Sequence, residues 1–282
     1  MTEPLNLPSA CFGNTPRKVI IFDKASAVVK MLSLNVNRLP HRRRMPGVGL
    51  TVSSEPAAGE ALTPRLRQRP AQAHTLAVAL VLHGGKARST RPASRRQLSA
   101  VRMTPFARSL ERAGSEQGLA VWTLQYRDRG WNDEGSQVAD ARWALEQIGQ
   151  KHPGVPVFLL GHSLGGRTAI AAAGHSSVRA ILALAPWLPE DEPIEQLRGV
   201  PVLIAHGTRD KWVSPRGSLN FAVRAQRAGL DVKRVEVVGV GHGMLRRVSL
   251  WHGLATYFVM SQLSAVSQKD GPPPEALLRS RI

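Results

Sequence analysis

The 282-residue sequence lacks several features that would assign it to a class of protein at once. Cys11 is its only cysteine, which excludes an intramolecular disulfide framework and a cysteine-rich metal site and favours the cytoplasm. No apolar run approaches the roughly 20 residues that cross a bilayer, and the first thirty residues lack the pattern of a secretory signal. We therefore expect a cytoplasmic protein with one α/β domain.

Acidic residues are also scarce, with 20 Asp and Glu against 38 Lys and Arg and a net charge of +18. Residues 1–104 hold most of the excess, with 17 Lys and Arg against 4 Asp and Glu, a charge of +13. Arginine clusters such as 41–44 and 65–69 are able to contact polyanions, but no aromatic residues interleave with them to stack on bases. We interpret them as solvated, flexible segments, so nucleic acid is a disfavoured partner.

From residue 75 onward, apolar runs typical of buried strands alternate with helical patterns. Thr104 is the predicted N-cap of the first helix, with Pro105 at its first position. No convincing strand precedes residue 75, so we expect the sheet to begin short at that edge. Strands are predicted over 75–82, 119–126, 155–160, 178–184, 200–205 and 232–238, and helices over 104–116, 135–150, 168–173, 215–228 and 245–263. This alternation predicts a mainly parallel sheet with helices on both faces.

A glycine-flanked serine connects the strand at 155–160 to a helix of small residues. Gly161-His162-Ser163-Leu164-Gly165 fits the G-x-S-x-G pattern, in which a serine nucleophile occupies a strained strand-to-helix turn. The pattern alone is weak, because it arises by chance in roughly one such chain in six. The strand before it and the helix after it therefore carry the interpretation of Ser163 as a nucleophile.

Two later loops supply the partners that a serine nucleophile needs. Asp210 follows the strand at 200–205, and His242 follows the strand at 232–238. Loops at the carboxyl ends of parallel strands line one crevice, so both side chains are expected to converge on Ser163. The alternatives are that His242 is an ordinary loop histidine and that Asp210 caps the helix at 215. His162 and His206 are interpreted as structural.

Several short pieces resemble the α/β-hydrolase superfamily: Y-R-D-R-G-W-N, A-R-W-A-L-E, G-H-S-L-G-G-R, A-L-A-P-W-L-P and H-G-T-R-D. They are similar to the small, lidless kind related to dienelactone hydrolases and simple esterases, and especially to actinobacterial members. The resemblance covers about residues 74–262 and nothing before them. It implies an α/β-hydrolase fold over 71–263, with 1–70 as a basic, poorly ordered extension and 264–282 as a flexible tail.

The resemblance also implies roles for individual residues. Ser163 is the implied nucleophile, His242 the general base and then acid, and Asp210 the group that orients it. The oxyanion hole is implied to consist of the backbone N–H groups of Leu164 and Gly85. No metal and no organic cofactor are implied.

The linker between two predicted strands, 186–199, has about fourteen residues, which are too few for a substantial cap domain. Trp187 in this linker is expected either to form an apolar wall of the substrate pocket or to be a core tryptophan without ligand contact. Glu190, Asp191 and Glu192 are expected to face water. Three further charged residues either border the pocket or belong to the surface: Arg127, Asp133 and Glu134.

These observations favour a serine hydrolase that cleaves ester or thioester bonds of small to medium substrates through an acyl-enzyme. Its expected partner is a small-molecule ester, and no membrane is expected. The alternative is a noncatalytic binding protein that kept the fold. A third possibility is a binder of acidic partners or nucleic acid through the basic front end, whose affinity would collapse with salt.

Overall fold

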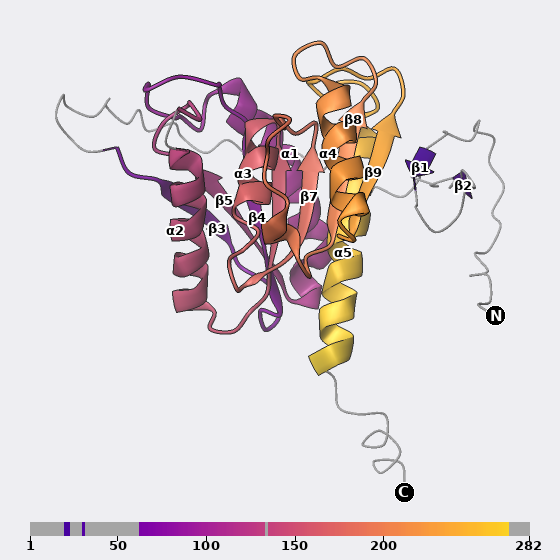
Figure 1. The fold of residues 1–282 in the computed structure, drawn as a ribbon. Coiled ribbons are helices and arrows are strands. Elements are labelled where there is room, and N and C mark those ends of the chain that lie inside the picture. The colour runs from indigo at the N-terminus through magenta and orange to yellow at the C-terminus, as the bar shows by residue number, and fades with distance from the viewer. Residues whose placement is uncertain (1–19, 23–29, 32–61, 133–134, 271–282) are drawn as a thin grey trace, which may run out of the picture.

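The computed structural model describes residues 20–22, 30–31, 62–132 and 135–270, shown in colour in Figure 1. A nine-stranded sheet forms its centre, in the order β2-β1-β9-β8-β7-β6-β4-β5-β3. Cys11, the cluster at 41–44, Asp133 and Glu134 lie outside the described residues. The strands are β1 (Ile20–Phe22), β2 (Lys30–Met31), β3 (Arg65–Arg69), β4 (Ala77–Leu82), β5 (Leu119–Gln125), β6 (Val157–His162), β7 (Val178–Leu184), β8 (Val202–Gly207) and β9 (Val232–Val237).

The expectation of a mainly parallel sheet is confirmed. All pairings among β4, β5, β6, β7, β8 and β9 are parallel, whereas β3 and β1 pair antiparallel with β5 and β9. The helices of the described residues are α1 (Leu98–Gly114), α2 (Ser136–Lys151), α3 (Leu164–Ala171), α4 (Pro215–Arg227) and α5 (Val248–Asp270), with short 3₁₀ turns η1 (Ser115–Gln117) and η2 (Glu195–Leu197).

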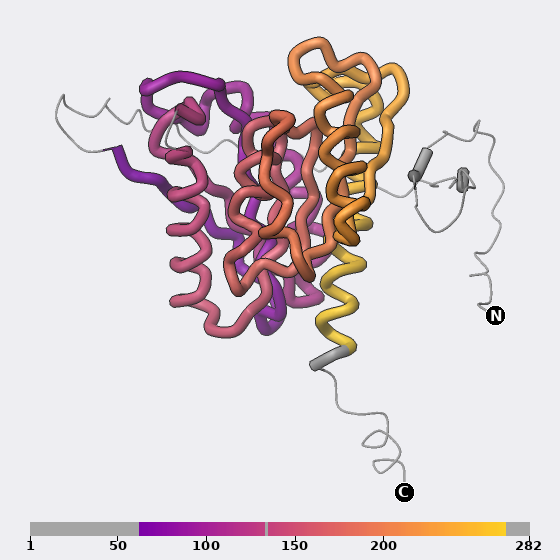
Figure 2. Tube along the Cα trace, in the orientation of Figure 1, coloured from indigo at the N-terminus to yellow at the C-terminus, as the bar shows by residue number. Residues whose placement is uncertain are grey.

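Helices cover both faces of the sheet because the central strands are apolar on both sides. In β4, Val78, Leu80 and Leu82 belong to the same core as buried residues of α2, α3 and α4, which lie in front of the sheet in Figures 1 and 2. The residues between them pack with α1 and α5 on the other face. The parallel strands thus bring all their following loops to one edge of the sheet.

The expectation that the sheet begins short before residue 75 is wrong. Strand β3 pairs antiparallel with β5 from Arg65 to Arg69, at the edge of the sheet. Leu66 is the only apolar residue of β3, so the sequence shows no alternation of apolar and polar residues that would predict a strand. Backbone pairing holds this edge strand. Arg69 is buried, and its Nε donates to Glu111 at 2.9 Å, which offsets the loss of water around the guanidinium.

The first helix begins seven residues before the predicted start. Gln97 occupies the N-cap position, and Pro105 lies inside α1 rather than in its first turn. A proline within a helix removes one backbone hydrogen bond, and Pro105 is exposed, so water is able to reach the carbonyl that lacks a donor. Helix α3 likewise begins earlier than predicted, directly after Ser163, and α5 extends beyond the predicted end at 263 to Asp270.

No cap domain interrupts the described part of the chain at the lid position. Between β7 and β8, residues 185–201 contain only the single turn η2. The edge of the sheet where the parallel strands end therefore carries only loops, as the expected lidless architecture requires.

Candidate active site

Ser163 occupies the sharp turn between β6 and α3. Its φ of 56° and ψ of −120° are unusual for a residue with a side chain, and they direct it out of the strand. The neighbouring glycines make this turn possible. A Cβ on Gly161 would lie 2.0 Å from the carbonyl oxygen of Gly165, and one on Gly165 would lie 2.5 Å from that of Leu82.

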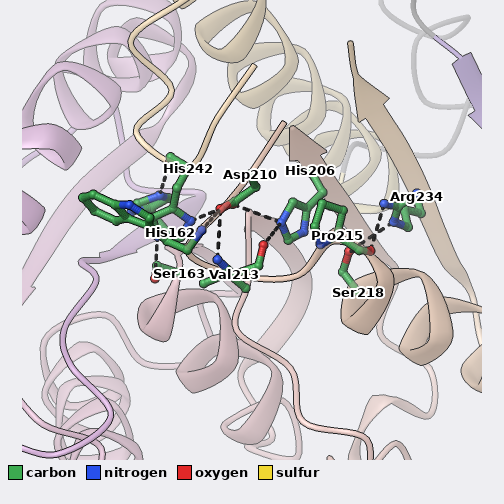
Figure 3. Close-up of polar contacts among 10 residues, drawn as sticks. His162, Ser163, His206, Asp210, Val213, Pro215, Ser218, Arg234 and His242 are labelled. Carbon is green, nitrogen blue, oxygen red and sulfur yellow. Dashed lines mark hydrogen bonds and ion pairs between the residues drawn. The ribbon is translucent and has the colours of Figure 1, made fainter. Parts of the chain in front are cut away.

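Ser163, His242 and Asp210 form one hydrogen-bonded chain, seen in Figure 3. Nδ1 of His242 lies 2.7 Å from Oδ2 of Asp210, and Nε2 lies 2.9 Å from Oγ of Ser163. A carboxylate only accepts, so Nδ1 carries the proton and the lone pair of Nε2 faces the serine hydroxyl. The three side chains come from the loops after β6, β8 and β9, as the topology predicted. In this geometry, Nε2 of His242 is placed to accept the hydroxyl proton of Ser163.

Asp210 is held as a buried carboxylate. Its Oδ1 accepts hydrogen bonds from the backbone N–H groups of Trp212 at 2.9 Å and Val213 at 3.0 Å. Burial by itself would raise the pKa of Asp210, but hydrogen bonds from His206, His242 and Val213 outweigh it and hold the pKa below its usual range. The alternative of a helix cap is not what the structure shows, because Ser214 occupies the N-cap position of α4.

A second histidine contacts the same carboxylate oxygen. His206 is completely buried, and its Nε2 lies 3.2 Å from Oδ2 of Asp210 and 3.3 Å from the carbonyl oxygen of Val213. Both neighbours are acceptors, so Nε2 carries the proton and donates. Both carboxylate oxygens of Asp210 therefore accept hydrogen bonds. One of the donors is His206, to which the sequence interpretation assigned only a structural role.

His162 contacts both the backbone and the ring of His242. Its Nε2 lies 3.0 Å from the carbonyl oxygen of His242, and the two rings lie 4.8 Å apart between centroids. Burial, with a further contribution from His242, lowers the pKa of His162 to about 3. The ring therefore stays neutral and donates to the backbone of the loop that carries His242.

The predicted oxyanion donors border Ser163. As the first residue of α3, Leu164 has an N–H group without an intrahelical acceptor. A Cβ on Gly85 would lie 3.4 Å from Cδ1 of Leu164, and one on Gly84 would lie 3.3 Å from Cβ of Ser163. The loop after β4 therefore passes directly beside the serine, where a donor to an oxyanion is required.

Trp187 lies beside the elbow, and its backbone N–H donates to the carbonyl oxygen of Ser163 at 3.2 Å. The guanidinium of Arg167 lies over two indole rings, 4.0 Å from that of Trp131 and 4.7 Å from that of Trp187. Arg167 Nε also pairs with Glu192 at 2.6 Å. Glu192 is buried, so the expectation that it faces water is wrong, because Arg167 offsets its desolvation.

Arg127 does not stand free at the site. Its Nε pairs with the buried Oδ1 of Asp140 at 2.6 Å, and its backbone N–H donates to the other oxygen at 2.8 Å. A hollow elsewhere in the molecule is also unrelated to this chemistry. Its lining comes from β3, β5 and α2 and from none of the loops that carry the three side chains: Leu66, Gln68, Trp122, Trp143, Gln147, Gln150 and Lys151.

Comparison with known proteins agrees with this architecture. Residues 124–198 match the family model Hydrolase_4, described as serine aminopeptidase, S33; the match includes Ser163 but neither Asp210 nor His242. No curated protein matches the sequence.

Solved structures match over most of their length. An α/β serine hydrolase homologue from Coxiella burnetii is 16% identical with a TM-score of 0.55, covering 69% of this chain and 90% of its own. A serine hydrolase without a lid from Xanthomonas campestris, XC6422, is 19% identical with a TM-score of 0.51, covering 74% and 91%. Est1E from Butyrivibrio proteoclasticus, solved with ferulic acid, is 16% identical with a TM-score of 0.52, covering 71% and 96%. The chain therefore has the lidless α/β-hydrolase fold.

Proposed function

We propose that this protein is a serine hydrolase that cleaves carboxylic ester or thioester bonds of small to medium substrates through an acyl-enzyme. The observation that carries the proposal is the unbroken chain from Ser163 Oγ through His242 to Asp210, on a strained turn at the loop edge of the sheet. A nucleophile, a general base and a carboxylate that orients the base require this arrangement of donors and acceptors.

In the first half-reaction, Ser163 Oγ attacks the carbonyl carbon while Nε2 of His242 takes its proton. The backbone N–H groups of Leu164 and Gly85 stabilise the negative charge on the carbonyl oxygen. His242 then gives the proton to the departing alcohol or thiol, which leaves the acyl group on Ser163.

In the second half-reaction, the neutral imidazole of His242 takes a proton from water as the water attacks the acyl-enzyme. Collapse of this second tetrahedral intermediate returns the proton to Ser163 and releases the acid. Asp210 stays ionised throughout and stabilises the imidazolium formed in each half-reaction.

The substrate pocket is proposed to lie beside Trp187. Its half-buried indole packs edge-on to Trp131 with ring centroids 6.4 Å apart, and its backbone holds the carbonyl of Ser163. The proposal places an apolar acyl group of the substrate against this indole.

Hydrolysis of p-nitrophenyl esters with acyl chains of increasing length tests the proposal. Ser163→Ala should lower kcat by about 10⁴-fold or more, because the nucleophile is lost. Ser261→Ala, on the exposed face of α5, is the matched control and should retain full activity. A matched thioester series then compares the two leaving groups. Equal rates in wild type and Ser163→Ala would contradict the proposal.

A further inference from the structure

Large apolar side chains stay exposed around His242. Trp212 is 81% exposed, Leu98 78% and Leu245 76%, although burial away from water stabilises large apolar side chains of this kind. Two half-exposed valines accompany them. We call the set the apolar rim: Leu98, Val101, Trp212, Leu245 and Val248.

Two members of the rim lie at the loop of the candidate base. The ring of Trp212 lies 5.5 Å from the ring of His242, between centroids. In the loop that follows His242, a Cβ on Gly243 would lie 3.4 Å from Cγ of Leu245. Solvent-exposed apolar side chains therefore lie at the ring of His242 and beside the next residue of its loop.

Helix α1 brings the remaining exposed leucine to the same place. A Cβ on Gly243 would lie 3.6 Å from Cζ of Arg102, so the first turns of α1 border the loop of His242. Leu98 precedes Arg102 by four residues and shares its helix face. At the start of the helix, Nε2 of Gln97 lies 3.2 Å from Nδ1 of His83, in the loop beside Ser163.

Three of the segments at this edge, 86–102, 208–216 and 239–248, are strongly basic. Residues 86–102 and 239–248 contain no acidic residue, and the acid in 208–216 is the buried Asp210. The exposed cations of these three segments form what we call the basic rim: Lys86, Arg88, Arg91, Arg95, Arg96, Arg209, Lys211, Arg216, Arg246 and Arg247. An anionic partner that also offers an apolar phase would satisfy both sets of side chains.

We infer that this edge docks onto an anionic lipid surface and that the ester hydrolysed at Ser163 is presented there. Exposed leucine and tryptophan enter the boundary between headgroups and acyl chains, and arginines contact lipid phosphates. The substrate half of this inference rests on the proposed hydrolase function, whereas the docking half does not. The expected cytoplasmic location supplies such a surface, since the cytoplasmic leaflet is negatively charged.

Two other occupants fit less well. A symmetric contact with a second copy would place the basic rim against itself, because a two-fold interface uses the same patch on both subunits. Nucleic acid would pair with the cations but would leave Leu98 and Leu245 in water.

The absence of long apolar runs led to the expectation that no membrane is involved, but that absence bears only on crossing a bilayer. In the described part of the chain, no helix is both long and apolar enough to do so. Docking through the rim places the protein on the surface instead.

Flotation of the Ser163→Ala protein with phospholipid vesicles tests docking without turnover. Binding is expected to vesicles that contain 30% phosphatidylglycerol and to be weak with phosphatidylcholine alone. The emission of Trp212 should shift to shorter wavelength on binding, and this shift should be absent in Trp212→Phe. Equal binding to both vesicles, or none to either, would overturn the inference.

Matched variants locate the binding surface. Arg95→Glu/Arg96→Glu and Leu98→Ser/Leu245→Ser should each weaken vesicle partitioning by about tenfold or more. Arg198→Glu/Arg227→Glu and Tyr257→Ser change exposed residues away from the rim and should not. Unchanged binding in the rim variants would place the lipid contact elsewhere and reject the docking surface.

Turnover tests the substrate half separately. The ratio of hydrolysis of a vesicle-borne ester to that of a water-soluble p-nitrophenyl ester should fall by about tenfold in the rim variants and stay constant in the controls. No hydrolysis of either ester together with intact flotation would reject the hydrolase function and keep the docking. A constant ratio in the rim variants would reject surface presentation of the substrate.

Discussion

His162 donates from Nε2 to the carbonyl oxygen of His242 across 3.0 Å, which links the residue before the nucleophile to the backbone of the candidate base. In the neutral ring Nε2 carries the proton that it donates and Nδ1 is unprotonated. Complete burial favours that state, because it disfavours a charged ring. The relationship makes the stability of the site depend on pH through a residue that takes no proton in the reaction.

The free energy of unfolding is expected to fall as pH drops below about 6.5. The pKa of His162 is about 3 in the folded protein and about 6.5 when unfolded, so the unfolded chain binds more protons between these values. For this one group the loss is roughly 1.5 kcal/mol between pH 6.5 and pH 5. Urea denaturation of wild type and His162→Gln measures it, and the variant should show the shallower dependence. Identical dependences would mean that His162 is not buried neutral.

His206 is expected to act as a positioning residue through Asp210. His206→Phe removes the donor at 3.2 Å and should lower kcat by about tenfold or more with less effect on KM, because Asp210 loses its fixed orientation. The resonance of the His242 Nδ1 proton, bonded to Asp210, should also shift in proton NMR spectra. An unchanged resonance with reduced kcat would indicate a merely structural effect.

Two glycine substitutions should have opposite effects on stability. A Cβ on Gly165 would lie 2.5 Å from the carbonyl oxygen of Leu82, so Gly165→Ala should destabilise the fold by about 3 kcal/mol or prevent folding. Gly149→Ala lies in α2 with no atom within 4 Å of the added methyl and should stabilise by about 0.5–1 kcal/mol. Thermal denaturation distinguishes them. Tolerance of Gly165→Ala would contradict the close approach of strand and helix.

The pair of Arg167 and Glu192 should be strongly coupled. Arg167→Gln leaves a buried carboxylate without its cation and should destabilise by about 3 kcal/mol. The double variant with Glu192→Gln should recover most of this loss, since both charges are removed. Urea denaturation of the four proteins gives the coupling energy. Additive effects would show that the pair contributes little.

Much of the fold could be predicted because its central strands are short apolar runs with helices between them. The positions of Ser163, Asp210 and His242 followed from the same argument, since each comes directly after a predicted strand. Parallel strands then bring these loops together without any knowledge of side-chain packing.

The remaining features depend on contacts between residues distant in the sequence. Strand β3 consists mostly of arginine and is held by backbone pairing to β5, which no local pattern indicates. The sequence around Glu192 is that of a surface acid, and only the fold places Arg167, twenty-five residues earlier, against it. His206 had a weak signal, in that it precedes Asp210 by four residues, but only the fold turns both side chains toward each other.

Labelling with a fluorophosphonate probe followed by mass spectrometry shows whether Ser163 is a nucleophile, because the reagent requires a serine activated by an adjacent base. Wild type should acquire a single adduct, located on the peptide that contains Ser163, and Ser163→Ala should acquire none. His242→Gln should be labelled much more slowly. A well-folded wild type that acquires no adduct, or one that acquires it at another serine, would exclude an activated Ser163 and favour a noncatalytic binding protein.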